Sequence, residues 1–264
     1  MASFLALLAF LQTAGVHVQR VSVPGPGGVN LDAALVLPAD KPIAQAVLAM
    51  HGCGGPFPVR DGQWAVVMAK RGHIVLLPDS FGSRGLGSQC GNFHREVTAK
   101  DLRRQDAIAS ARWLTARPGT PPGGLVMMGW SDGGSTVLAT AGVAPDLPAG
   151  LFRRFAAFYP GCASSNWNPA WKPSAPILIL IGESDDWTPA RPCHELAARD
   201  PADITLIGYP GAYHDFDAPD RPLKVRAGTT TKSGMATTGT NAPARQDVLR
   251  RVPGWLETGV QAAP

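Results

Sequence analysis

Short apolar runs alternate with helical segments along most of this chain, and the alternation limits the possible fold more than any other feature. The runs at residues 44–50, 73–77, 125–128 and 177–181 have no polar face. Such runs are typical of strands in the interior of a parallel sheet, and parallel strands need helical crossovers between them. The pattern therefore predicts an α/β fold, with helices on both faces of a mostly parallel sheet.

The same reasoning places the other elements. Further strands are expected at residues 16–23, 29–37, 155–159 and 204–208, which makes about eight strands in all. Helices are expected at 62–71, between Thr98 and Pro118, and at 133–143, 189–199 and 243–258. The low-complexity stretch 227–240 is expected to be an exposed loop.

Composition narrows the class of protein. The chain has 264 residues, of which 45% are hydrophobic, so one domain with a large core is expected over residues 16–264. Its net charge of +4 comes from basic residues in scattered pairs such as Arg103-Arg104, without a basic stripe. This distribution argues against a nucleic-acid partner.

The N-terminus and the cysteines bear on location. Residues 3–11 form an apolar block with the length of a signal-peptide core, so 1–15 is a candidate signal peptide. The alternative is an N-terminal helix packed on the domain. No apolar run reaches the length of about 18 residues that a membrane span needs. Four cysteines, an even number, favour two disulfides and a secreted or periplasmic protein, whereas a cytoplasmic enzyme would keep them reduced.

Residues 129–134, GWSDGG, contain the pattern G-x-S-x-G between a predicted strand and a small-residue helix. A tight turn between strand and helix lifts the serine out of the sheet, and the glycines remove Cβ atoms that would clash there. The helix dipole favours negative charge at this position. A serine that merely caps a helix would also fit the letters, but the full context predicts that Ser131 is a nucleophile.

A nucleophilic serine needs a histidine base that a carboxylate orients. In this architecture the acid and the histidine follow the serine along the chain. His214 is the one of six histidines that follows the last predicted strand in a loop, so it is the expected base. The acid is expected after 177–181, where Asp185 and Asp186 compete and Glu183 is a third candidate.

Ester cleavage also needs two backbone N–H donors for the developing oxyanion. One is expected from Asp132, directly after the serine. The other is expected from the loop HGCGG at 51–55, at Cys53 or alternatively Gly52, with His51 bracing the loop. His51 and Cys53 have no further ligands at a zinc spacing, so no metal and no cofactor are expected.

Taken together, these segments resemble the α/β-hydrolase superfamily, and most closely its dienelactone hydrolase family. The resemblance covers about residues 20–259 and is carried by HGCGG at 51–55, LPDSFGSRG at 77–85, GWSDGG at 129–134, GESDDWTP at 182–189 and YHDF at 213–216. The superfamily pattern G-x-x-D-x-x-x-P falls on Gly182, Asp185 and Pro189, which selects Asp185 over Asp186.

The chain also departs from that family. The name-giving enzymes use a cysteine nucleophile where this chain has Ser131, and they carry a glutamate where it has Gly52. Of their two carboxylate-binding arginines, one corresponds to Arg84, and Ala218 stands where the other would be. The resemblance therefore implies a serine ester hydrolase whose acyl group is unassigned.

Aromatic residues in the loops at the strand ends are candidates for the substrate pocket. With Arg84, the expected substrate-binding residues are Phe57, Phe81, Trp130 and Trp187. Trp167 and Trp171 are expected to help as a short lid.

The cysteines are expected to pair as Cys53–Cys90 and Cys162–Cys193. The members of each pair follow strands expected to be neighbours, which brings their Cα atoms within disulfide range.

The leading hypothesis is a hydrolase of a small carboxylic ester or lactone, with a small-molecule partner. A peptidase or acyltransferase on the same triad, and a ligand-binding protein without turnover, remain alternatives.

Overall fold

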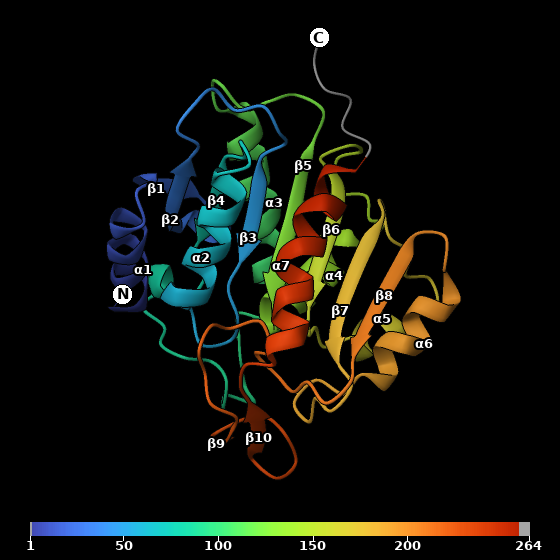
Figure 1. The fold of residues 1–264 in the computed structure, drawn as a ribbon. Helices are drawn as coiled ribbons and strands as arrows, with labels where there is room; N and C mark the ends of the chain where they lie inside the picture. The colour runs from blue at the N-terminus through green and yellow to red at the C-terminus, as the bar shows by residue number, and fades with distance from the viewer. Residues whose placement is uncertain (1, 259–264) are drawn as a thin grey trace.

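The computed structural model describes residues 2–258, which form an eight-stranded sheet flanked by helices (Figure 1). The spatial order of the strands is β1-β2-β4-β3-β5-β6-β7-β8. The strands are β1 His17–Pro24, β2 Asn30–Leu37, β3 Val47–Met50, β4 Val75–Pro78, β5 Leu125–Trp130, β6 Phe152–Phe158, β7 Ile177–Gly182 and β8 Ile204–Tyr209. The predicted α/β-hydrolase fold is confirmed.

Burial explains the arrangement of the sheet. Every residue of β3, β4, β5 and β7 is buried, as expected for parallel strands that are covered on both faces. The strand β1 pairs antiparallel with β2 and has mostly exposed or half-buried residues, so it tolerates the edge position. The register pairs Met50 with Gly129 and Trp130 with Phe158. The loops that follow these strands therefore meet at one edge of the sheet.

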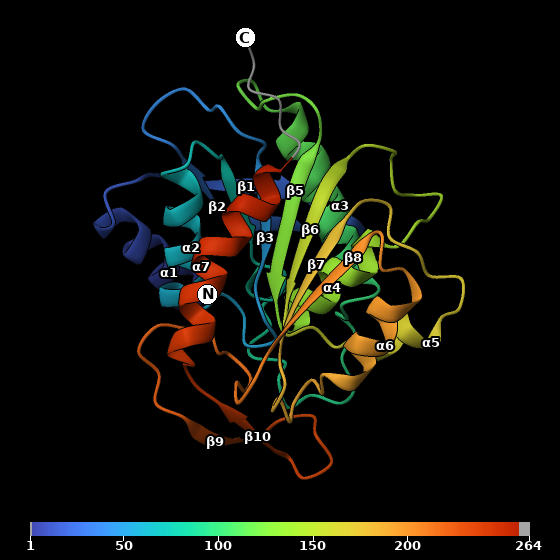
Figure 2. The same cartoon turned by 45° about the vertical axis from the view of Figure 1, so that its right-hand side comes forward.

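Seven α-helices surround the sheet within residues 2–258. They are α1 Ala2–Thr13, α2 Pro58–Ala69, α3 Leu102–Ala116, α4 Asp132–Ala141, α5 Ala163–Trp167, α6 Arg191–Arg199 and α7 Ala242–Glu257. The helices α2 and α7 cover one face, and α3 and α4 cover the other (Figures 1 and 2). The core lies between these two layers and the sheet.

The structure decides what two segments of the sequence form, residues 2–13 and residues 227–240. Residues 2–13 form the packed helix that was the alternative to a signal peptide: Leu7 and Leu11 are fully buried, and a Cβ on Gly62 of α2 would overlap the ring of Phe10. The expectation of an exposed loop at 227–240 is wrong. This stretch belongs to a hairpin of β9 Lys224–Ala227 and β10 Met235–Thr238, in which Ala236 and Thr238 are buried.

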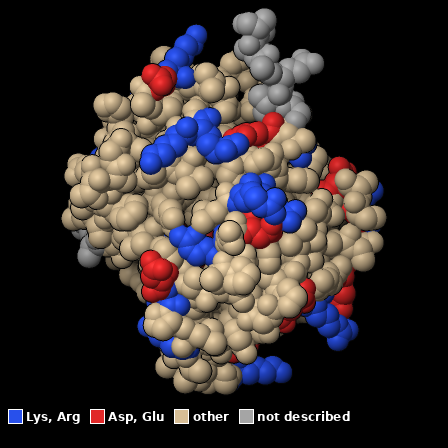
Figure 3. Space-filling view, in the orientation of Figure 1, with Lys and Arg blue, Asp and Glu red and all other residues tan. Residues whose placement is uncertain are grey.

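Charged side chains of both signs are visible on one face of the molecule. On the face shown in Figure 3, basic and acidic side chains lie interspersed among uncharged residues. In the part of the chain that the structure describes, no helix has the length and hydropathy to cross a bilayer.

Candidate active site

Ser131 lies on a strained turn between β5 and α4. Its backbone has φ 55° and ψ −116°, a conformation that residues other than glycine rarely adopt. Close packing imposes this turn. A Cβ on Gly129 would lie 2.5 Å from the carbonyl oxygen of Gly133, and a Cβ on Gly133 would overlap the carbonyl oxygen of Met50. The glycines of the motif therefore let α4 start directly against the strand ends.

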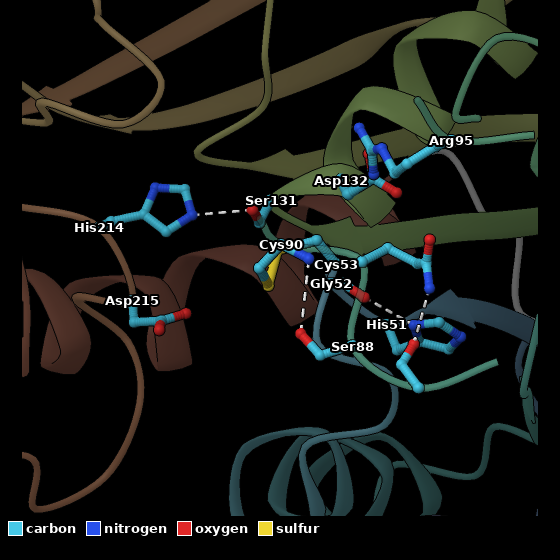
Figure 4. Close-up of a disulfide and its surroundings, with 12 residues drawn as sticks. His51, Gly52, Cys53, Ser88, Cys90, Arg95, Ser131, Asp132, His214 and Asp215 are labelled. Atoms are coloured by element: carbon cyan, nitrogen blue, oxygen red, sulfur yellow. Dashed lines mark hydrogen bonds and ion pairs between the residues drawn. A yellow bond between two sulfur atoms is a disulfide. The ribbon is translucent and has the colours of Figure 1, made fainter. Parts of the chain in front are cut away.

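His214 and Asp185 complete a hydrogen-bonded chain that begins at Ser131. The distance from His214 Nε2 to Ser131 Oγ is 2.8 Å (Figure 4), and the distance from His214 Nδ1 to Asp185 Oδ2 is also 2.8 Å. All three residues are buried or nearly so. The structure thus brings together the serine, histidine and aspartate that the sequence predicted, in hydrogen-bonding order.

The two competing acids have separate partners. Asp185 Oδ1 accepts hydrogen bonds from the amides of Trp187 and Thr188, at 2.9 and 2.8 Å, while its Oδ2 faces His214. Asp186 is exposed and points to the β9–β10 hairpin, where it accepts from the amide and hydroxyl of Thr237. Asp185 therefore orients the histidine, and Asp186 ties the hairpin to the same loop.

The surroundings of His214 favour its protonated form. Burial by itself lowers the pKa of His214, but the carboxylate of Asp185, through its charge and its hydrogen bond, outweighs burial and raises that pKa above the ordinary value. Tyr159 and Trp187 pack against the imidazole, with ring centroids 4.6 and 4.8 Å from it. These contacts hold the imidazole in the orientation in which it reaches both Ser131 and Asp185.

The HGCGG loop lies beside Ser131. A Cβ on Gly52 would be 3.6 Å from the Cβ of Ser131, which is van der Waals contact, so the loop packs directly beside the serine. Within the described chain, the amides of Cys53 and Asp132 donate to no protein group. The disulfide Cys53–Cys90, with its Cα atoms 4.9 Å apart, fastens this loop to the segment after β4 (Figure 4). Both amides are therefore available to an oxyanion.

A buried arginine supports this loop from below. Arg103 donates to the backbone oxygen of His51 at 2.6 Å and pairs with the carboxylate of Asp132, which also binds Arg95. Burial and the neighbouring Arg103 lower the pKa of His51 to about 4, so its imidazole is neutral. His51 Nε2 then accepts from the amide of Ser80, which makes His51 a bracing residue.

A cavity of about 300 Å³ opens at Ser131 and His214, and two of the five expected substrate-binding residues, Phe57 and Trp187, line it. The guanidinium groups of Arg221 and Arg226 stack over these two rings, at 4.9 and 5.3 Å from the centroids. Neither guanidinium has an acidic partner among residues 2–258. The cavity is therefore aromatic and positively charged.

The expectation that Phe81, Arg84 and Trp130 bind substrate is wrong for this cavity. Trp130 is fully buried because β5 is covered on both faces, and its indole donates to Asp217. Phe81 is buried under Arg103. The guanidinium of Arg84 is paired with the buried carboxylate of Asp106, through hydrogen bonds of 2.7 and 2.8 Å.

Sequence reasoning missed a second buried arginine beneath the site. Arg60 of α2 lies between the rings of Phe57 and Trp130 and bonds to Asp61, Asp215 and the hydroxyl of Tyr159. The Tyr159 hydroxyl in turn donates to Asp217 at 2.7 Å. The sequence signal was the acidic pair in HDFD at 214–217, which could not stay buried without a cation.

Nowhere in residues 2–258 do three or more histidine, cysteine or acidic side chains converge in a way that could hold a metal ion.

The second disulfide, Cys162–Cys193, joins the segment after β6 to α6. Both disulfides have the pairing expected from the sequence, and two disulfides are typical of an extracellular or periplasmic protein.

The fold and this serine at a strained strand–helix turn define an α/β hydrolase. Residues 31–259 match the dienelactone hydrolase family, and the chain belongs to that family. A search of curated proteins gave no match.

Solved structures show the same fold at low sequence identity. A Klebsiella pneumoniae protein assigned as a dienelactone hydrolase is 17% identical, with a TM-score of 0.69, over 92% of this chain and 99% of its own. Thermogutta terrifontis esterase 2 is 20% identical, with a TM-score of 0.65, over 95% and 97%. A Pyrobaculum calidifontis esterase is 17% identical, with a TM-score of 0.64, over 97% and 91%.

Proposed function

We propose that this hydrolase cleaves a carboxylic ester or lactone through an acyl-enzyme on Ser131. The observation that carries the proposal is the continuous hydrogen-bonded chain from Ser131 Oγ through His214 to Asp185, with 2.8 Å at both links. Ser131 and His214 line a cavity, and among residues 2–258 the amides of Cys53 and Asp132, which lie beside or next to the serine, donate to no protein group. These are the parts that acyl transfer needs.

The reaction follows from the positions of these groups. Ser131 Oγ attacks the carbonyl carbon while His214 Nε2 takes the hydroxyl proton, and the carboxylate of Asp185 stabilises the imidazolium. The amides of Cys53 and Asp132 donate to the oxyanion. His214 then gives its proton to the leaving oxygen, and the ester bond breaks. A water molecule, deprotonated by His214, hydrolyses the acyl-enzyme and regenerates Ser131.

A neighbouring structure supports the choice of chemistry. Thermogutta terrifontis esterase 2 has been solved phosphorylated by paraoxon, and the same group transfer to Ser131 is what a serine nucleophile predicts here. In this proposal residues 16–264 form one hydrolase domain. The two disulfides support an exported enzyme, and cleavage of residues 1–15 as a signal peptide stays a prediction.

The test is a nucleophile substitution with a labelling control. Ser131→Ala should lose p-nitrophenyl ester turnover by several orders of magnitude without unfolding, and it should lose the mass added by paraoxon. Ser22→Ala, at an exposed serine on β1, should keep both. If Ser131→Ala kept more than about a tenth of the activity, which corresponds to less than about 1.4 kcal/mol in the barrier, Ser131 would not be the nucleophile.

A further inference from the structure

Ser131 lies between two hollow regions of the surface. The first is the cavity of about 300 Å³ described above, called here the histidine cavity. The second is a small space of about 170 Å³ that Ser131 and Asp132 line, next to a groove of about 730 Å³. The small space shares Ser131 and Trp187 with the histidine cavity and shares Asp132 and Ser135 with the groove. The small space therefore lies between the histidine cavity and the groove.

The groove follows one face of α4, and we call it the α4 groove. Asp132, Ser135, Ala139 and Gly142 line it, and their spacing of three and four residues places them on the same side of the helix. At a rise of about 1.5 Å per residue, this row is roughly 15 Å long. Its first member is Asp132, the residue directly after the nucleophile, so the groove starts close to Ser131.

The far end of the α4 groove is closed by Trp171. Its indole donates to the backbone oxygen of Leu138 at 3.1 Å, and a Cβ on Gly142 would lie 2.8 Å from the indole nitrogen. Trp171 is thus packed at the end of the groove, whereas Trp167, the other expected lid residue, is 78% exposed. The small residues Ala139 and Ala163 also line the groove, together with Lys100 and Arg104, and Arg104 donates to the backbone oxygen of Ala139 at 3.0 Å.

The position of His214 assigns the two arms of an ester to the two spaces. His214 must protonate the leaving oxygen, so the leaving group has to lie on the side that the imidazole faces. His214 lines the histidine cavity, and it is not among the described residues that line the small space or the α4 groove. The acyl arm is therefore directed over Asp132 and away from the histidine.

We propose that the α4 groove is the acyl-binding site and that the substrate is an extended ester, with an acyl arm long enough to run along α4. This inference rests on the proposed function. A compact lactone or an acetate would fill only the space at Ser131 and leave the groove empty. An acyl arm that lies on Ala139 buries apolar surface, and an acidic group on that arm would be attracted to Lys100, which also lines the groove.

The experiment compares acyl lengths in variants that fill the groove. In the wild type, kcat/KM should rise from p-nitrophenyl acetate through butyrate to decanoate. Ala139→Phe should lower the decanoate-to-acetate ratio by about tenfold or more, because the ring occupies the path of the chain. Ala163→Leu, a smaller change from α5, should lower the ratio in the same direction and guards against a folding defect in the first variant. Ala198→Phe, at an exposed position on α6, is the matched control and should keep the wild-type ratio.

A second series tests the direction of the substrate. With acetates of longer and longer alcohols, Ala139→Phe should keep the wild-type ratios, because the alcohol lies in the histidine cavity. If Ala139→Phe instead changed the alcohol series, or changed neither series, the acyl assignment would be overturned while ester cleavage at Ser131 stood. If the wild type cleaved no ester and Ser131 took no label from paraoxon, the proposed function would fail, and this inference with it.

Discussion

The two loops that meet at Ser131 are held in different ways. The HGCGG loop, residues 51–55, is fastened by the Cys53–Cys90 disulfide and by Arg103, which binds a backbone oxygen. The histidine loop, residues 209–217, has no covalent link and is held by the buried side chain of Arg60. A disulfide constrains chain entropy at any pH, whereas a buried ion pair depends on charge.

The two arginine clusters also have opposite charge balance. Arg60 faces Asp61, Asp215 and Asp217, so carboxylates outnumber cations around it. Burial raises the pKa values of Asp61 and Asp217, and the charge of Arg60 offsets this rise only in part. Asp132 faces two arginines. Burial would raise its pKa, but Arg103 and Arg95 outweigh burial and lower it. As the pH falls, Asp61 and Asp217 on the side of the histidine loop should therefore be protonated before Asp132, which lies on the side of the nucleophile.

The largest predicted effect separates the two acids of the histidine side. Asp185→Asn should lower kcat by roughly 10⁴-fold, as expected when the orienting carboxylate of a triad is lost. Asp186→Asn should lower kcat far less, because Asp186 only binds Thr237 of the hairpin. Steady-state kinetics with a p-nitrophenyl ester measure both. The reverse order would place the triad acid at 186.

Much of the fold was accessible from the sequence, because buried parallel strands are continuous apolar runs and because glycines mark the turn at Ser131. The β9–β10 hairpin was not accessible. Its residues are mostly threonine, glycine and lysine, and they form strands only because Asp186 and the backbone of His214 pair with them. The amino-acid composition of a segment does not reveal such long-range contacts.

The candidate site also contains residues that could be predicted from the sequence and residues that could not. Ser131, His214 and Asp185 follow strand ends in a fixed chain order, so the sequence could rank them. Whether a loop aromatic faces the cavity or the core depends on packing, and Trp130 and Phe81 turned inward to cover buried arginines. Arg60 is followed by Asp61, and Arg103 by Arg104, so in the sequence each arginine looks like part of a solvated helix face.

The next prediction tests how far the histidine side depends on Arg60. Arg60→Met should reduce the free energy of unfolding by about 3–5 kcal/mol, because it leaves buried carboxylates without their cation. Arg20→Met breaks the pair with Asp32, in which Arg20 is 52% exposed, and should cost far less, because exposed ion pairs contribute little to stability. Urea denaturation at neutral pH provides both values. Equal losses would mean that Arg60 contributes no more than a surface charge.

The disulfides give a matched pair for the nucleophile side. Their closed loops span 37 and 31 residues, so loss of either should cost a similar stability, about 3–4 kcal/mol. Only Cys53–Cys90 lies at the proposed oxyanion amide. Replacing both of its cysteines by alanine should therefore lower kcat by about tenfold or more, with KM less affected. The double variant of Cys162 and Cys193 should keep kcat; an equal loss in both would remove the link between the first disulfide and the oxyanion amide.

The smallest predicted effect is a shift of the pH profile. As a base, His214 must be neutral, so kcat/KM should fall as the pH drops through its pKa, and that pKa should lie above the ordinary value of about 6.5 because Asp185 raises it. His51 cannot produce this limb, because its pKa is about 4. The carboxylate of Asp215 also raises the pKa of His214, and Asp215→Asn should therefore move the acid limb to lower pH. Asp79→Asn, whose carboxylate lies 3.6 Å from His51 on the nucleophile side, should leave the limb in place. If Asp79→Asn moved the limb and Asp215→Asn did not, the titrating group would be His51, and the assignment of the base to the histidine loop would be wrong.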